Sequence, residues 1–424
     1  MKIHEMTASE LARRLSRREL SALEVVDAFL ARIGARDDEL HAWTAVDAEL
    51  ARRQARACDA GALRGPLHGL PVGVKDILDT ADLPSEYGTP IYLGHRPAAD
   101  AACVASARAA GAVVLGKTVT TEFATMKPAD TVNPLNPRHT PGGSSSGSAA
   151  AVAARMVPFA YGTQTVGSII RPAAYCGVVG YKPSFGTLSR AGMKLASESL
   201  DTVGVIAGSV DDAALLVAGS AIRMDLRAVE TVGKPRLGLC RSPNWSYMTK
   251  EGAQAFEAAV QRLAKAGATL VERELPQEFN ELDALRVRIL VYEIARSLSH
   301  EAGRHRERIS APLLELIDAG AKMPYADYAS ALEHADACRR RLADHLRDVD
   351  ALVTPSATGE APLGLQSTGE TAMNRLWTLL HGPCVTVPAA RGPAGLPVGV
   401  QLYGLPGADA RTLGAAKWAE RALA

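Results

Sequence analysis

The sequence predicts a layered α/β fold. From residue 66 onward, short apolar runs bounded by glycine and proline alternate with segments of helical periodicity, a pattern typical of strands and helices packed in layers. The first 60 residues carry helical patterns only, and residues 250–345 are charged and mostly helical. Since the chain shows no internal repeat and no low-complexity linker, we expect a single domain over residues 1–424.

Residues 1–60 are expected to form a helical arm on the body of the protein. Thr7-x-x-Glu10 and Ser21-x-x-Glu24 match capping boxes, in which side-chain oxygens bind the free N–H groups at a helix start. After the second box, apolar residues recur at helical spacing and give one apolar face.

Buried strands are expected wherever short apolar runs lie between turn residues. A helix over 101–110 precedes the second run, a final helix covers roughly 408–422, and the helices of 250–345 are expected to cover the sheet from outside. The runs predicted as strands are GLPVGVK (69–75), GAVVLGK (111–117), RPAAYCGVVGYKPSFG (171–186), PRLGLC (235–240), DALVTP (350–355), PCVTVP (383–388) and LPVGVQLYG (396–404).

Composition argues against several classes of protein. The 47 basic and 46 acidic residues leave a net charge of +1, which favours neither nucleic acid nor an anionic membrane as a partner. The six cysteines have no disulfide-type spacing, and no apolar stretch approaches the roughly 18 residues that would span a bilayer. The N-terminus lacks the features of a secretory signal. We therefore expect a reduced, cytoplasmic protein.

Two short motifs match known functional patterns, but the residues within or before them do not fit the structures that those patterns require. GAVVLGKT (111–118) matches the phosphate-loop pattern, but its variable positions are Ala-Val-Val-Leu, which favours a buried strand over a flexible anion-binding turn. GSSSG (143–147) matches a nucleophile elbow, but the Pro/Asn-rich segment before it is not the strand that an elbow requires. His300 and His305 do not form HExxH and are expected on a helix surface, so we expect no metal and no cofactor.

A third, longer motif carries the functional prediction. GGSSSGS (142–148) runs into an Ala-rich helix and then into VPFAYGTQTVGSIIRPAAYCGVVGYKPSFG (157–186), while LPVGVKDILDT (70–80) lies upstream. Together these segments resemble the amidase signature family over most of the chain. The resemblance implies a large twisted mixed β-sheet flanked by helices on both faces. It also implies a serine amide hydrolase.

The family resemblance assigns a role to each matching residue. Lys75 matches the base, Ser144 the proton relay and Ser168 the nucleophile, with a cis peptide bond between Gly143 and Ser144. A lysine can act as a base only when neutral, and burial favours the neutral form, as the apolar residues flanking Lys75 suggest. The matching oxyanion hole consists of the backbone N–H groups of Thr165, Val166, Gly167 and Ser168.

The segment around Ser168 departs from the commonest family pattern, D-T-G-G-S-I-R. Gln164 replaces the acid and Ile170 the arginine, so both members of the ion pair that the family pattern implies are missing, and Val166 replaces a glycine. Arg171 resembles the arginine of a malonamidase-like branch, as does MNRLWTLLHGPC (373–384). In that branch the arginine holds a substrate carboxylate; a structural ion pair is the alternative. We expect Arg171, Gln164 and Met126 to contact the substrate.

These features together predict an amidohydrolase that cleaves a small-molecule amide to an acid plus ammonia or an amine. The alternatives are a carbamate or ester hydrolase of the same family, the A subunit of a glutamyl-tRNA amidotransferase, or a non-catalytic protein that kept the fold. The expected partner is the amide substrate, with no nucleic acid and no membrane. The sequence leaves the oligomeric state open, a homodimer being one alternative.

Overall fold

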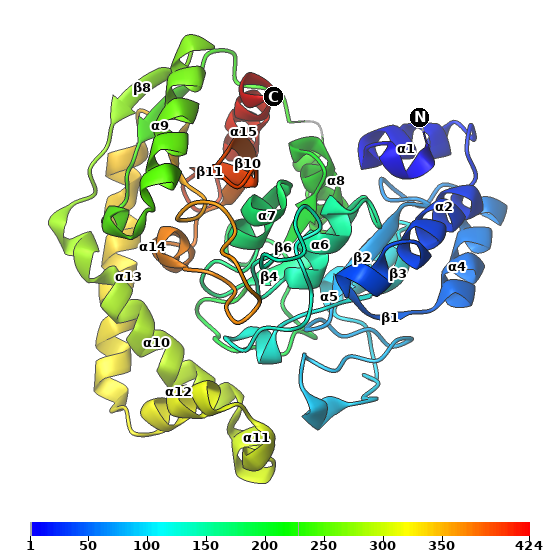
Figure 1. The fold of residues 1–424 in the computed structure, drawn as a ribbon, viewed down its shortest axis with the longest axis horizontal. Helices are drawn as coiled ribbons and strands as arrows, with labels where there is room; N and C mark the ends of the chain where they lie inside the picture. Colours follow the sequence, from blue (N-terminus) through cyan, green and yellow to red (C-terminus); the bar gives the residue numbers. More distant parts are fainter. Residues whose placement is uncertain (1, 228) are drawn as a thin grey trace.

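A computed structural model describes residues 2–227 and 229–424, and its strands form one eleven-stranded sheet (Figure 1). The strand order is β1-β3-β2-β4-β6-β5-β10-β11-β9-β7-β8. The strands are β1 (Trp43–Val46), β2 (Pro71–Lys75), β3 (Val113–Thr118), β4 (Phe159–Gln164), β5 (Val179–Lys182), β6 (Thr202–Ala207), β7 (Arg236–Leu239), β8 (Thr269–Glu272), β9 (Ala351–Pro355), β10 (Cys384–Arg391) and β11 (Pro397–Tyr403).

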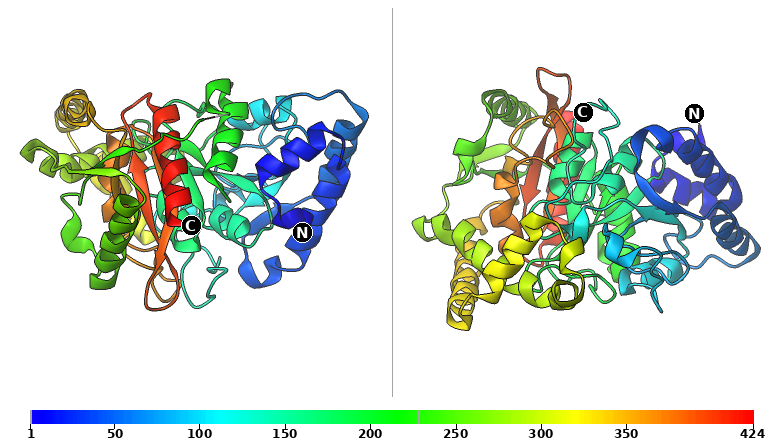
Figure 2. Two further views of the ribbon diagram at one scale, coloured as in Figure 1. Left: turned by 90° about the horizontal axis from the view of Figure 1, so that it is seen from above. Right: turned by 60° about the horizontal axis from the view of Figure 1, so that its bottom comes forward.

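The sheet is mixed, which confirms the predicted fold class. β2 pairs in parallel with β3 and β4, and β7 pairs in parallel with β8 and β9. The strands between these two groups, and β1 at the edge, pair antiparallel. Strands β4, β6 and β11 are buried along their whole length, because helices cover both faces of the sheet (Figure 2).

The helices form two groups on the sheet. α6 and α7 pack on each other and on the central strands, whereas α5, α8, α9 and α15 form a second group that contacts β5, β6, β10 and β11. The helices are α1 (Ala8–Ser16), α2 (Ala22–Gly34), α3 (Asp37–Leu40), α4 (Ala48–Ala60), α5 (Ala102–Ala109), α6 (Ser146–Ala153), α7 (Ile170–Cys176), α8 (Val210–Ala221), α9 (Lys250–Lys265), α10 (Leu282–Ser297), α11 (Ser299–Arg304), α12 (Ala311–Ala321), α13 (Tyr325–Leu346), α14 (Ala372–Leu379) and α15 (Asp409–Leu423).

The N-terminal arm differs from its prediction in two respects. Ser21 and Glu24 form the expected capping box, but Thr7 caps α1 without a return bond, since Glu10 binds two arginines of its own helix instead. The arm also contains β1, which adds an edge strand to β3. A purely helical arm was therefore wrong.

Residues 250–345 cover the sheet only in part. α9 packs on β10 and β11, as predicted, and β8 adds a strand that the prediction lacked. Helices α10, α12 and α13 contact one another more than the sheet, and in Figure 1 they extend with α11 to the lower left. This helical lobe forms one wall of the cavity described below.

The other predicted strands are present, apart from one correction. Residues 171–186 are only half strand, because α7 occupies the first half and β5 the second. A left-handed Gly177 ends α7 and lets the chain turn directly into the sheet. Among the helices of the described residues, none combines the length and apolar character needed to cross a bilayer. The single-domain organisation stays a prediction.

Candidate active site

Lys75 ends strand β2 in a buried, largely apolar setting. Its neighbours Val72, Val74, Ile77 and Leu78 are fully buried, as predicted. The Lys75 Nζ lies 2.7 Å from Ser144 Oγ and 2.8 Å from Thr163 Oγ1, and within the described chain it has no carboxylate at ion-pair distance. Burial lowers the pKa of Lys75 to about 7, against a smaller opposing effect of the Asp201 charge. A large fraction of this amine is therefore neutral near pH 7.

Ser144 is presented by a tightly packed glycine loop before α6. The Gly143–Ser144 peptide bond is cis, in agreement with the family resemblance. Gly142 has a φ of +82°, and a Cβ there would lie 2.8 Å from Pro172 Cα. A Cβ on Gly143 would lie 2.7 Å from the Thr368 side chain. The glycines thus let this loop approach α7 and residue 368 closely enough to place Ser144 against Lys75.

Gln164 holds the segment that carries Ser168. Its Oε1 accepts hydrogen bonds from Ile169 N at 2.9 Å and Ile170 N at 3.1 Å, and its Nε2 donates to Thr378 Oγ1 at 2.9 Å. The side chain is fully buried and does not line the cavity. Substrate contact by Gln164 stays a prediction that this geometry does not favour. The side-chain amide of Gln164 gives the start of α7 an uncharged hydrogen-bond acceptor. Position 164 therefore needs no acid, and no arginine is needed to balance one.

The loop of residues 165–168 exposes a run of backbone donors. Within the described chain, the N–H groups of Val166, Gly167 and Ser168 donate no hydrogen bond to another residue. Helix α14 braces this loop, because Thr378 Oγ1 donates to Val166 O at 2.7 Å and a Cβ on Gly167 would lie 2.5 Å from Asn374 Oδ1. Free, fixed N–H groups of this kind can bind a developing oxyanion.

Ser168 lies at the cavity and next to the glycine loop. Only 8% of its surface is exposed, and its backbone oxygen accepts a 3.3 Å hydrogen bond from Ser145 N. Its Oγ, however, has no hydrogen bond to Ser144 among the described residues, so the structure brings Lys75 and Ser144 into contact but leaves the second step of the predicted relay unmade. Catalytic hydrogen bonds are often long without substrate and shorten when it binds.

A cavity of about 760 Å³ opens in front of Ser168. Thr165, Val166, Arg171 and Met126 line it; their roles in the oxyanion hole and in substrate contact stay predictions. The opposite wall comes from α10, α12 and the 366–371 segment, and none of these residues was predicted at the site. Nothing local distinguishes those residues, since they join the site only through packing of the helical lobe.

Arg171 is buried in α7 without an acidic partner. One terminal nitrogen donates to Gly143 O at 2.7 Å and to Thr368 Oγ1 at 2.9 Å, while its Nε and Nη1 bind no other group of the described chain. Arg375, also in the cavity wall, instead pairs with Asp283 and Glu370. Burial lowers the pKa of Arg171, with Tyr175 and then Glu370 opposing it. The arginine therefore has unused donors beside the cavity.

The phosphate-loop letters fall on a structural strand, as the physical reasoning predicted. Lys117 is fully buried in β3, 3.1 Å from Asp76, and its Nζ also donates to Leu78 O. Ser144–Ser146 of the GSSSG motif follow a loop, not a strand. Cys176 is buried, and burial raises the pKa of its thiol, so it is not an activated nucleophile.

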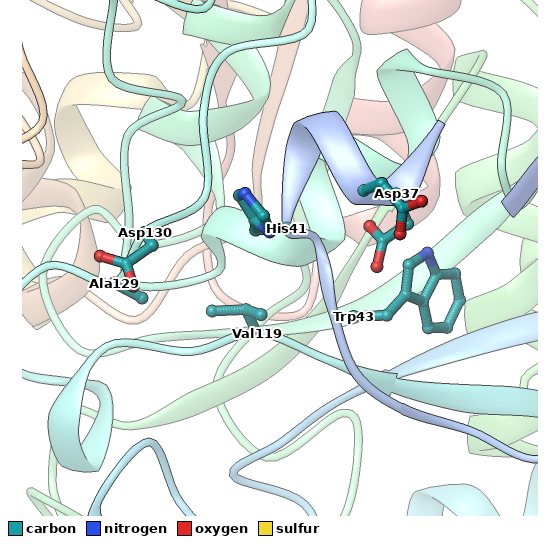
Figure 3. Close-up of a pocket in the computed structure, with 7 residues that line it drawn as sticks. Asp37, His41, Trp43, Val119, Ala129 and Asp130 are labelled. Carbon is teal, nitrogen blue, oxygen red and sulfur yellow. The ribbon is translucent and has the colours of Figure 1, made fainter. Parts of the chain in front are cut away.

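A second hollow of about 610 Å³ lies near β1 (Figure 3). Asp37, His41 and Trp43, on the segment joining α3 and β1, line it together with Val119 and Asp130. Asp37 Oδ1 accepts a hydrogen bond from Ala42 N at 2.8 Å, so this carboxylate fixes the turn out of α3. None of the predicted site residues lines this hollow.

Comparison with known proteins places the chain in one family. The family model described as Amidase matches residues 24–413. The chain is 36% identical to the A subunit of the glutamyl-tRNA(Gln) amidotransferase from Salinispora arenicola, over 96% of this chain and 95% of that protein. It is 33% identical to the corresponding protein of Geobacter metallireducens, over 100% and 98% of the two chains.

Solved structures agree with this assignment. The peptide amidase of Stenotrophomonas maltophilia is 30% identical with a TM-score of 0.83, covering 99% of this chain and 97% of that one. A further amidase structure is 31% identical with a TM-score of 0.90, covering 99% and 100%. The family match spans the glycine loop, the Ser168 segment and the lysine strand described above, and the chain belongs to the amidase family.

Proposed function

We propose that this protein is an amidohydrolase that cleaves a small-molecule amide to an acid plus ammonia or an amine. The observation that carries the proposal is Lys75, a buried amine bonded to two hydroxyls rather than to a carboxylate. With a pKa of about 7, it can be a neutral base under ordinary conditions. Ser144 contacts it directly, and Ser168 lies at the cavity beside the glycine loop.

In the proposed reaction, Ser168 Oγ attacks the amide carbonyl as its proton passes to Ser144, whose own proton passes to Lys75. The N–H groups of residues 166–168 would bind the oxyanion that forms. The C–N bond then breaks, and the leaving nitrogen takes a proton from Ser144, which regains one from Lys75. Water hydrolyses the ester on Ser168 by the same route in reverse. This scheme requires the Ser168 hydroxyl to approach Ser144 when substrate binds.

We further propose that the substrate carries a carboxylate held by Arg171. The guanidinium is buried at the cavity with two nitrogens that bind nothing else in the described chain. A structural ion pair, the alternative from the sequence, receives no support from its contacts. A carboxylate in the cavity would give this unpaired guanidinium a charge-assisted acceptor.

The direct test is a panel of amides, carbamates and esters assayed with the wild type, Ser168→Ala and Ser144→Ala. We expect hydrolysis by the wild type and loss of at least about 1,000-fold in kcat for either variant, as for catalytic residues that act as a unit. A serine-directed phosphonate should label the wild type and not Ser168→Ala. Labelling of an unrelated serine, or equal turnover by Ser168→Ala, would remove Ser168 as nucleophile. Preference for carbamates or esters in the panel would favour that alternative.

A component of a tRNA-dependent amidotransferase is the second candidate, favoured by the names of the relatives at 33–37% identity. The residues around Ser168 here, with Gln164 and Ile170, differ from the acid–arginine pattern that the sequence resemblance associates with that component. Assaying the purified chain alone separates the two. Efficient hydrolysis of free amides supports the amidohydrolase, whereas activity only with added tRNA and partner proteins supports the amidotransferase. Light scattering on the same sample tests the homodimer.

A further inference from the structure

One face of helix α10 forms an apolar wall of the active-site cavity. Val287, Leu290, Val291 and Ile294 all line it, at spacings of three, one and three residues that keep them on one side of the helix. These positions span about 10 Å along the helix axis. Arg286 stands at the N-terminal end of this wall, where it pairs with Asp283.

The facing residues extend the apolar surface. Leu316 and Pro312 of α12 line the cavity from the lobe, and Met126 and Val166 line it from the body of the protein. Val287 and Met126 are exposed, with 44% and 59% of their surface accessible, although both are large and apolar. An apolar surface of this extent beside a reactive serine is expected to be covered by ligand.

The two polar groups assigned to the reaction lie apart from this wall. Ser168 and Arg171 come from the β4–α7 region, whereas the apolar side chains other than Val166 come from the helical lobe and the 126 segment. The cavity volume of about 760 Å³ is in the range that holds drug-sized molecules. An acidic amide of only a few atoms would reach Ser168 and Arg171 but leave the α10 wall in water.

We propose that the substrate is an amphipathic amide with an aliphatic or aromatic arm that lies against the α10–α12 wall. Its amide carbonyl is at Ser168 and its carboxylate at Arg171, so the inference rests on the proposed function and specifies its substrate class. The arm supplies binding free energy by removing apolar surface from water, on the protein as well as on the ligand. Val166, which replaces a glycine of the family pattern, adds a side chain to the same apolar surface.

The test uses two matched series of amides, N-alkanoylglycines and N-alkyl succinamates, each with arms of two to eight carbons. The two series place the arm on opposite sides of the scissile bond. We expect kcat/KM of the wild type to rise in one series by roughly three- to four-fold per methylene, about 100-fold over four methylenes. Hydrolysis of either series without any rise of kcat/KM with chain length overturns the proposal.

Three variants locate the effect. Leu290→Asn and Val287→Asn should each flatten the rise to about ten-fold or less over the same four methylenes, because part of the wall is lost. The effect is measured within each variant, as the ratio of kcat/KM for the longer member to kcat/KM for the two-carbon member, so that an equal loss for both members does not count as a change in the rise. Arg288→Asn is the matched control, being exposed on the same helix outside the cavity lining, and should keep the full rise. A full rise in both wall variants overturns the proposal.

Binding to Ser168→Ala separates this inference from the proposed function. Calorimetry of the two- and eight-carbon members on this variant requires no chemistry. Tighter binding of the eight-carbon member, lost in Leu290→Asn, supports the apolar wall even where the wild type hydrolyses neither series; that result would contradict the amidohydrolase alone. Equal binding of the two members overturns the wall even where hydrolysis occurs.

Discussion

The pH dependence of acylation is the most direct test of Lys75 as the base. With a pKa of about 7, roughly half of the Lys75 amines are neutral at pH 7, about a tenth at pH 6 and about nine tenths at pH 8. At the ordinary lysine pKa of 10.5, only about 0.03% would be neutral at pH 7. We therefore expect kcat/KM for a neutral amide to rise about ten-fold from pH 6 to a plateau above pH 8.

The assay measures kcat/KM from pH 5 to 9, together with the rate of phosphonate labelling, because both depend on activation of Ser168. Asp201→Asn supplies the control: the Asp201 charge raises the pKa of Lys75, so its removal should move the midpoint to lower pH. A midpoint near 10, or one that Asp201→Asn moves upward, would contradict a buried neutral base at position 75.

The same pKa shift has a consequence for stability. Between pH 7 and 10.5, the unfolded chain binds one more proton at Lys75 than the folded chain, so this residue makes the free energy of unfolding rise with pH. The slope is about 1.4 kcal/mol per pH unit. Lys75→Met removes it. Relative to the wild type, the folded state of the variant should therefore be about 2 kcal/mol more stable at pH 7 than at pH 9 in urea denaturation, because the slope reaches its full value only above pH 7. A pH-independent difference would refute the reasoning.

Three further substitutions test neighbouring groups. Arg171→Met should lower kcat/KM for carboxylate-bearing amides about 10- to 100-fold more than for neutral amides, because a charge-assisted hydrogen bond to the carboxylate is lost. Steady-state assays measure both losses, and equal losses would mean that Arg171 has only a structural role. Gln164→Leu should lower the free energy of unfolding by about 2–3 kcal/mol, because two N–H groups lose their acceptor, whereas Gln164→Glu keeps that acceptor; denaturation curves compare them. Lys117→Met should lower the free energy of unfolding by about 3–5 kcal/mol, because Asp76 is left buried without its partner. If the ion pair is the cause, adding Asp76→Asn to this variant should restore much of the lost stability.

Much of the fold could be predicted because its central strands are apolar runs between turn residues, and the prediction fails where that pattern is missing. β1 is four residues between helical patterns, and it is a strand only because β3 pairs with it. Likewise, residues 171–176 are apolar enough for a strand, but they form α7 because Gln164 binds the N–H groups at its start. In both cases a distant partner decides the local structure.

The candidate site divides in the same way. Lys75, Ser144, the 165–168 loop and Arg171 lie in contiguous motifs, so the sequence could name them, and their neighbourhood follows from the parallel pairing of β2 with β3 and β4. The α10 wall could not be named, because its residues form an ordinary helical face until the lobe packs against the cavity. The sequence position of Gln164 does not show that its side chain binds Ile169 N, Ile170 N and Thr378 Oγ1 outside the cavity lining.

The distinction between Lys75 and Lys117 shows what makes a lysine suited to act as a base here. The two lie on neighbouring parallel strands, with Val74 paired to Lys117, and both are fully buried. Burial lowers the pKa of both amines, but at Lys117 the Asp76 carboxylate at 3.1 Å opposes that shift and favours the ammonium form. Lys75 has two hydroxyls, which accept a hydrogen bond from the ammonium but carry no charge to offset its burial. Burial alone therefore does not decide which lysine can act as a base, because the hydrogen-bonding partners also matter. An acid placed next to Lys75 should keep its amine protonated and remove its ability to act as a base. Thr163→Asp places a carboxylate where Lys75 already donates, and we expect it to raise the pKa of the amine and abolish activity near pH 7, while Thr163→Val, which adds no charge, should retain a measurable rate.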